Sequence, residues 1–234
     1  MPDQLQLRGG STSEHSSFTG AAREVTVDTT KKTLVVHDGS TQGGTPLMKE
    51  SGTSFDVAFN GVSVGKGANS VAGNTVLGQA ALDAVTNGHD NVAIGINALT
   101  NNTTGEKNVA VGSQASVLNT TGQDNTAVGQ AALYNNTSGS TNTALGRAAL
   151  NANTTGGSNV GVGYQALDAN TSGNNSTAVG TYSLSAATTA SGNTAVGTYS
   201  LNATTTASNN VAVGNGALQV NTTGTANTAV GQGS

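Results

Sequence analysis

The sequence predicts an all-β protein whose larger part is a parallel β-solenoid. A phrase close to Asn-Thr-Ala-Val-Gly returns at a fixed interval, its β-branched residues flank a small one, and Asn-Thr-Thr-Gly stretches separate the copies. Alternation with a period of two indicates a strand, and four such residues are too few for a helix. The intervening stretches are typical of turns, because Asn and Gly accept positive φ and Ser or Thr bond the local backbone.

The glycine that ends each phrase recurs every seventeen residues without a slip. The residue before it is always Val, Leu or Ile, and the residue three before it is always Thr or Val. These glycines are Gly78, Gly95, Gly112, Gly129, Gly146, Gly163, Gly180, Gly197, Gly214 and Gly231. A single coil cannot bury its apolar face, so a fixed period predicts stacked coils. We expect about ten coils over residues 65–234, forming a rod roughly 50 Å long at about 4.8 Å per coil.

A leucine stands four residues after the glycine in eight of nine copies, and Ser116 replaces it in the other. The leucines are Leu82, Leu99, Leu133, Leu150, Leu167, Leu184, Leu201 and Leu218. We expect them to stack as one apolar ladder, with the Val or Leu before each glycine as another. The short stretch that ends in this leucine is predicted to be a second strand.

Two further columns of the repeat have predicted roles. The Asn that opens most phrases is expected to form an amide ladder, as in other stacked strands. The Ala between the two β-branched residues is expected to face the other way, where its small side chain lets another copy of the chain approach. Because a thin seventeen-residue coil buries little apolar surface, we expect the solenoid to be intertwined or packed as a homotrimer.

Charge divides the chain near residues 50–60. Residues 1–50 hold five of the eight basic and six of the twelve acidic residues, whereas Asp168 is the sole charged residue after position 150. The stretch "EVTVDTTKKTLVVHDG" predicts a hairpin. The predicted organisation is a domain at residues 1–50, a neck at 51–64 and the repeat at 65–234. Gly65, thirteen residues before Gly78, is expected to belong to a capping coil.

Composition excludes several classes of protein. A net charge of −4 argues against nucleic acid as a partner. The absence of cysteine excludes a disulfide framework and thiolate metal sites. Neither a long apolar run nor a Sec-type signal peptide is visible. His15, His37 and His89 match no ligand spacing, so we expect no metal, no cofactor and structural roles for all three.

Two less favoured readings concern carboxylates and threonines. A tailspike glycosidase needs two carboxylates about 5–9.5 Å apart. Asp90 and Asp124 are two coils apart, hence about 10 Å, with Glu106 one residue earlier in the coil between them. The threonines from Thr86 to Thr222 suggest an ice-binding array, yet consecutive threonines point to opposite faces of a strand. We expect local turn bonds for the hydroxyls and no enzymatic activity.

Two families resemble parts of the chain. "NVAIG" at 91–95 and "NVAVG" at 108–112 and 210–214 resemble the head repeats of trimeric autotransporter adhesins, which implies a left-handed β-roll. "RGG" at 8–10, "FTGAARE" at 18–24, "TVDT" at 26–29, "VVHDG" at 35–39 and "PL" at 46–47 resemble the N-terminal domain of the phage major tropism determinant. That second resemblance implies a small trimeric β-prism at residues 1–50, and the family's lectin-like receptor-binding domain is replaced here by the repeat.

These resemblances imply a trimeric phage tail fibre. Residues 1–50 would attach it to the tail, the baseplate or an adaptor protein and trimerise it, and the repeat would extend toward a host receptor for adhesion. Its location would be the virion, after assembly in the host cytoplasm. The alternatives are a fragment of a bacterial trimeric adhesin or a capsid head fibre. The stop at "NTAVGQGS", within a phrase, further suggests a missing distal part or a separate tip protein.

Overall fold

A computed structural model describes residues 8–10, 25–28, 33–36, 45–46, 57–59 and 61–234 of the chain. The chain divides into two compact units, Met1–Gly52 and Thr53–Ser234. The described parts are almost entirely strands and turns, as the sequence predicts.

The first unit contains a four-stranded sheet in the order β1-β2-β3-β4. Its strands are β1 (Arg8–Gly10), β2 (Val25–Asp28), β3 (Thr33–Val36) and β4 (Thr45–Pro46). β1 runs parallel to β2, whereas β2–β3 and β3–β4 are antiparallel. Val25 pairs with Val36 and Asp28 with Thr33, which confirms the predicted hairpin.

The second unit begins with an antiparallel hairpin rather than a coil. β5 (Val57–Phe59) pairs with β6 (Val62–Gly65), and β6 pairs antiparallel with β7 (Thr75–Gly78). A short 3-10 helix, η1 (Ala68–Ser70), lies between β6 and β7. The expectation that Gly65 ends a capping coil is therefore wrong, because its strand runs against the direction of the repeat and covers the edge of β7.

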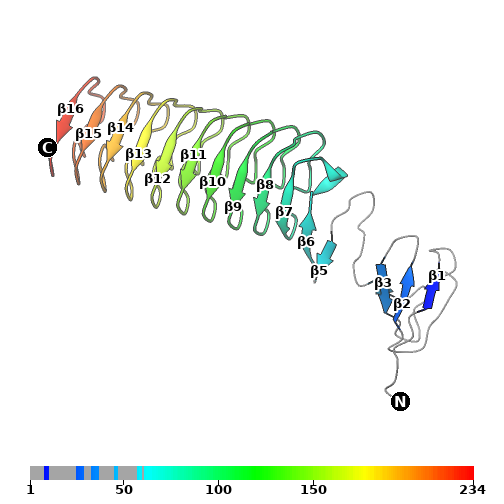
Figure 1. Ribbon diagram of the computed structural model, residues 1–234. Coiled ribbons are helices and arrows are strands. Elements are labelled where there is room, and N and C mark those ends of the chain that lie inside the picture. Colours follow the sequence, from blue (N-terminus) through cyan, green and yellow to red (C-terminus); the bar gives the residue numbers. More distant parts are fainter. Residues whose placement is uncertain (1–7, 11–24, 29–32, 37–44, 47–56, 60) are drawn as a thin grey trace, which may run out of the picture. The chain divides into compact units, whose positions relative to one another are not determined.

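Ten parallel strands, one per copy of the phrase, form the rest of the sheet (Figure 1). After β7 they are β8 (Val92–Ile94), β9 (Val109–Val111), β10 (Thr126–Val128), β11 (Thr143–Leu145), β12 (Val160–Val162), β13 (Thr177–Val179), β14 (Thr194–Val196), β15 (Val211–Val213) and β16 (Thr228–Val230). Each residue pairs with the residue seventeen places on, as Ala127 does with Ala144. Ten strands enclose nine complete turns, which confirms the solenoid.

The middle residue of each strand faces the interior. Seven of these alanines, from Ala93 to Ala212, are fully buried, and they pack with the leucine ladder in one core. The first and last strand residues point outward, and Leu77 and Val128 are 44% and 36% exposed. The predicted orientation of the strand is therefore wrong. The leucines of the opposite wall pack against these small side chains in the lumen.

The stretch that ends in leucine is a turn, not a second strand. The residues two and four places after the corner glycine have a left-handed backbone conformation, as in Ala131 (φ 54°) and Leu133 (φ 54°). Each leucine N–H still donates to the next coil, as from Leu133 to the carbonyl oxygen of Ala149 at 2.9 Å. The turn thus satisfies its backbone between coils, and no ladder of extended strands is needed on this wall.

The glycine column marks the corner after each strand. Gly129 has φ 132°, and a Cβ there would lie 2.6 Å from the carbonyl oxygen of Gly146 in the next coil. Both conditions admit only glycine. This close backbone stacking accounts for the glycine from Gly78 to Gly214, where a further coil follows.

Candidate functional site

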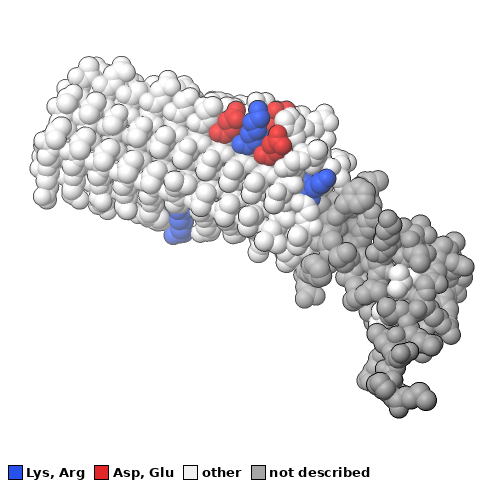
Figure 2. Space-filling view, viewed as in Figure 1, with Lys and Arg blue, Asp and Glu red and all other residues white. Residues whose placement is uncertain are grey.

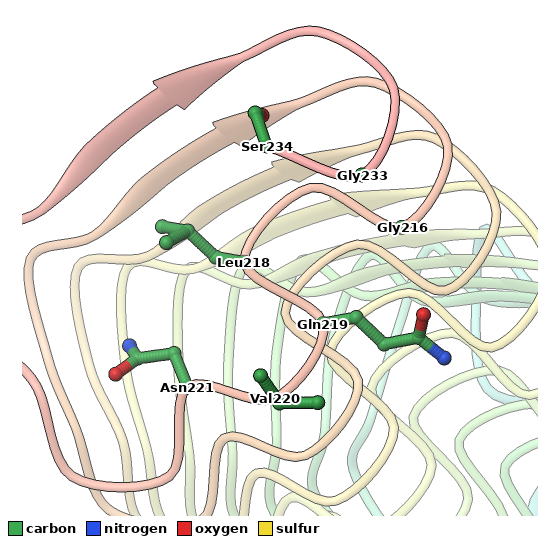
Figure 3. Close-up of a pocket in the computed structure, with 7 residues that line it drawn as sticks. All are labelled: Gly216, Leu218, Gln219, Val220, Asn221, Gly233 and Ser234. Atoms are coloured by element: carbon green, nitrogen blue, oxygen red, sulfur yellow. The ribbon is translucent and has the colours of Figure 1, made fainter.

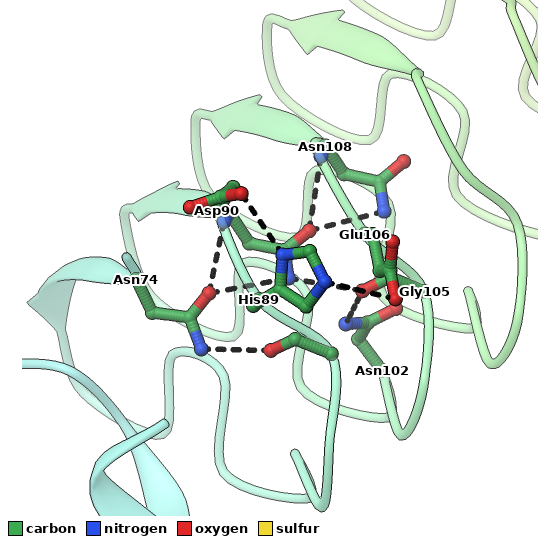
Figure 4. Close-up of polar contacts among 9 residues, drawn as sticks. Asn74, His89, Asp90, Asn102, Gly105, Glu106 and Asn108 are labelled. Carbon is green, nitrogen blue, oxygen red and sulfur yellow. Dashed lines mark hydrogen bonds and ion pairs between the residues drawn. The ribbon is translucent and has the colours of Figure 1, made fainter. Parts of the chain in front are cut away.

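A buried asparagine ladder runs along the solenoid. Asn108 lies between Asn91 and Asn125: its Nδ2 and backbone N–H both donate to Oδ1 of Asn91, at 3.1 and 2.9 Å. Its Nδ2 also donates to the carbonyl oxygen of Gly122 at 2.9 Å. Figure 4 shows the first steps of this ladder. The predicted amide ladder is confirmed, and Ser176 is its one substituted step between Asn74 and Asn227.

A second asparagine ladder, which the sequence analysis missed, lies seven residues after the corner glycine. Asn119 donates from Nδ2 to Oδ1 of Asn102 at 2.7 Å and to the carbonyl oxygen of Gly122 at 3.0 Å. The ladder covers five consecutive coils, Asn102 to Asn170, all buried. Its signal was available in the sequence, since asparagine recurs there every seventeen residues.

The threonine column links neighbouring coils. The hydroxyl of Thr120 donates to the carbonyl oxygen of Thr137 at 2.9 Å, and the same bond recurs in seven consecutive coils from Thr86 to Thr188. The expectation of local turn bonds is wrong, because the stacked register brings the next coil's carbonyl within reach.

The predicted repeat positions occupy distinct layers of the coil. The corner glycines stack backbone on backbone, and the leucines from Leu82 to Leu201 are fully buried, whereas Leu218 in the last coil is partly buried. Ser116 occupies the leucine position and is also buried, and its hydroxyl has no hydrogen-bond partner. These residues form the scaffold on which the exposed side chains stand.

A charged cluster stands over the first coils. On the face in Figure 2, most charged side chains of the solenoid gather near its N-terminal end, and a basic side chain on the lower edge stands apart from them. His89 lies 2.9 Å from an Asp90 carboxylate oxygen and 3.1 Å from one of Glu106 (Figure 4). Lys107 and Asp124 stand at the position of Asp90 in the next two coils. The backbone N–H of Lys107 donates to the carbonyl oxygen of His89, and that of Asp124 to the carbonyl oxygen of Glu106.

The acidic side chains of this cluster alternate with basic ones. Lys107 occupies the position between Asp90 and Asp124, and Glu106 is engaged by His89. Within the described residues, no group of three or more His, Cys, Asp or Glu side chains is arranged to hold a metal ion. His15 and His37 lie outside the described residues.

Three tyrosines on consecutive coils form a second exposed cluster that the sequence analysis did not single out. Tyr182 and Tyr199 stack with ring centroids 5.4 Å apart and an interplanar angle of 7°. Tyr164 meets Tyr182 edge to face at 5.2 Å and 87°. The guanidinium carbon of Arg147 lies 5.6 Å from the centre of the Tyr164 ring. The seventeen-residue interval between Tyr182 and Tyr199 could have shown the stack.

Asp168 lies beside these rings. Partial burial raises the pKa of its carboxyl group above the ordinary 3.8, and hydrogen bonds, among them one from the Gln165 amide at 3.0 Å, offset part of the rise. Its Oδ1 is buried and has no hydrogen-bond partner. The pKa of Tyr182 is raised chiefly by a hydrogen bond with Tyr164, and then by desolvation and by nearby groups that include Asp168.

A shallow pocket lies in the last two coils (Figure 3). Gly216 and Gly233, which line it, take the place that Tyr182 and Tyr199 hold in earlier coils. Leu218 borders it, and its N–H donates to the carbonyl oxygen of Ser234 at 2.7 Å. The aromatic column therefore ends at Tyr199.

The described part of the chain has no helix that is long and apolar enough to cross a membrane.

Comparison with known proteins concerns the N-terminal part of the chain. The tail fiber receptor-binding protein of Bordetella phage BPP-1 is 61% identical over 49 residues, which are 21% of this chain and 13% of that protein. Two solved structures, the I1 and U1 variants of the major tropism determinant, are 41% identical. Each match covers 27% of this chain and 20% of the other, with a TM-score of 0.18.

The chain thus spans a small fraction of the length of the relatives that it matches. Residues 5–41 match the family described as the major tropism determinant N-terminal domain, which agrees with the resemblance seen in the sequence.

Proposed function

We propose that this chain is a phage tail fibre in which residues 1–50 attach to the tail, the baseplate or an adaptor protein. The match of residues 5–41 to the tropism determinant family carries the proposal. The curated relative is named as a tail fibre receptor-binding protein. The N-terminal domain is the shared part, so attachment is the role that this part supplies.

The repeat, residues 65–234, serves as the shaft that holds an adhesive surface away from the particle. Its coils are joined by backbone bonds, two asparagine ladders and the threonine hydroxyls, so extension must break many bonds in each turn. Its nearly uncharged surface limits nonspecific attraction to nucleic acid and charged lipids. The protein is located in the virion and is assembled in the host cytoplasm, without enzymatic activity.

The fibre is a homotrimer whose copies pack through the outer face of the solenoid sheet. This face carries two uncharged columns, the first and last residues of the ten strands. Leu77, Val128, Leu145 and Val213 in the last column are 36–44% exposed. One column consists of Val, Leu and Ile and the other of Thr and Val, and a large exposed apolar patch of this kind is typical of an interaction surface. The two columns together hold twenty side chains, an area on the order of the roughly 800 Å² per partner that specific interfaces bury.

Adsorption of the phage tests the adhesin role. We expect the purified chain to compete with virions for host cells, and antibodies against residues 65–234 to decorate the tail in electron micrographs. Antibody label on the capsid vertices would instead identify a head fibre. If these antibodies label no part of the virion, the chain is not a virion protein.

A further inference from the structure

The tyrosine stack presents a rigid aromatic surface on an otherwise aliphatic and polar shaft. Tyr199 is 40% exposed, and its ring is fixed on one side by the parallel ring of Tyr182. Gly216 takes the equivalent position in the next coil and has no side chain to cover the other side (Figure 3). Tyrosine held in this way offers contact area at a small cost in side-chain entropy.

Polar groups flank the same rings. Asp168 and Asn202 stand at one position of their coils, three residues after the column that contains Tyr182 and Tyr199. Asn202 donates to the carbonyl oxygen of Tyr182 at 3.2 Å and to the Ser185 hydroxyl at 2.7 Å, which fixes its amide beside the stack. The Oδ1 of Asp168 is buried, and its other carboxylate oxygen accepts a hydrogen bond from the Gln165 amide at 3.0 Å, so this side chain is held in place beside the stack.

We propose that this tyrosine patch, formed by Tyr182, Tyr199 and Asn202, binds pyranose rings of host-surface glycans. A pyranose has an apolar C–H face that packs on an aromatic ring, and its hydroxyl groups require acceptors such as the Asn202 amide oxygen. Arg147 covers Tyr164, so the open rings are those nearer the C-terminal end. The patch rests on the proposed adhesin role, which it makes specific by naming the ligand class and the residues.

Binding is tested with the full chain and three probes: chitohexaose, maltohexaose and delipidated bacterial lipopolysaccharide. Saturation-transfer NMR is expected to show transfer to the ring C–H protons of at least one probe. Tyr182→Ala and Tyr199→Ala are expected to weaken that binding tenfold or more, and Asn202→Ala severalfold. Tyr199→Phe retains the ring and is expected to bind within twofold of the unmodified chain.

Tyr134→Ala removes a half-buried tyrosine outside the patch and serves as the matched control, and thermal unfolding checks that each variant is folded. Absence of transfer to all three probes overturns the proposal. Unchanged binding in the folded Tyr182→Ala and Tyr199→Ala variants also overturns it. The tyrosine stack would then serve only to stabilise the contact between neighbouring coils. If these variants still block phage adsorption as the unmodified chain does, the patch fails while the adhesin role stands. If the unmodified chain binds a probe but never blocks adsorption, the adhesin role fails.

Discussion

At the scale of residues, burial of each leucine side chain in the ladder offsets the cost of its left-handed backbone conformation. Leu99, Leu133 and Leu150 have φ between 51° and 54°, a left-handed conformation that costs an L-residue about 1–2 kcal/mol. Full burial of a leucine returns about 1.5–3 kcal/mol. Ser116 has the same backbone, with φ 52°, but neither the apolar side chain nor a partner for its hydroxyl.

Ser116→Leu should therefore stabilise the solenoid by about 1–3 kcal/mol, because it adds a buried side chain between Leu99 and Leu133 and removes an unsatisfied hydroxyl. Denaturant titration followed by circular dichroism measures the change. The reverse substitution, Leu133→Ser, should cost at least as much. A lower unfolding midpoint for Ser116→Leu would mean that the neighbouring leucines already fill the space.

A second pair of positions varies together among the coils. A Cβ on Gly139 would lie 2.4 Å from Oδ1 of Asn136, three residues earlier, and six of the nine copies combine asparagine and glycine at these two positions. The two copies with alanine in place of this glycine, Ala190 and Ala207, have Ala187 and Thr204 in place of the asparagine.

We expect Gly139→Ala alone to destabilise the fold by about 1–3 kcal/mol through overpacking. Addition of Asn136→Ala should recover part of this loss, since it removes one of the colliding side chains. A double-mutant cycle is expected to give a favourable coupling of about 0.5–3 kcal/mol. Strictly additive losses would show that the clash with Gly156 in the next coil dominates.

At the scale of elements, the unit is one coil of seventeen residues. Each coil contacts its two neighbours through the same bonds, so its contribution to stability is nearly independent of its place in the stack. A residue can therefore pair with the equivalent residue of any other coil, because these positions differ by multiples of seventeen.

Deletion of residues 126–142 should therefore leave a folded protein that is about 4.8 Å shorter, because Asn125 then joins Thr143 in register. Deletion of residues 126–134 shifts the columns by about half a coil and should unfold the neighbouring turns. Small-angle scattering and thermal unfolding compare the two. Equal damage from both deletions would contradict the independence of coils.

The period and turn residues were sufficient to predict the solenoid, its register and the amide ladder. The direction in which the strands face was not predictable from alternation alone, since a Val-Ala-Val strand can bury either set. The answer depends on how far Leu133 and its equivalents reach across the lumen from a left-handed turn, and nothing in the local sequence shows that conformation. The tyrosine stack was overlooked because its first member, Tyr164, stands one position out of column.

At the scale of the whole molecule, the proposed trimer depends on the outward face of the strands. The alanines that the sequence suggested as the contact between copies are inside, so the proposed contact surface is formed by the outer Thr, Val, Ile and Leu columns.

Val128→Lys together with Val196→Lys should reduce the assembly from three chains to one, because two lysines would have to be buried without partners. Multi-angle light scattering gives the mass. Thr121→Lys, on an exposed turn away from this face, is the matched control and should leave the trimer intact. An unmodified chain that is monomeric, or a trimer that survives both lysines, would contradict the proposed face.

Hydrogen bonds between neutral groups and apolar burial join successive coils, and His89 adds ion pairs with Asp90 and Glu106 on the first coils. Contacts between neutral groups are not screened by dissolved ions. The contacts between coils of the proposed shaft are therefore expected to change little with salt concentration. A virion that carries such a fibre can adsorb to its host in fresh water and in brine.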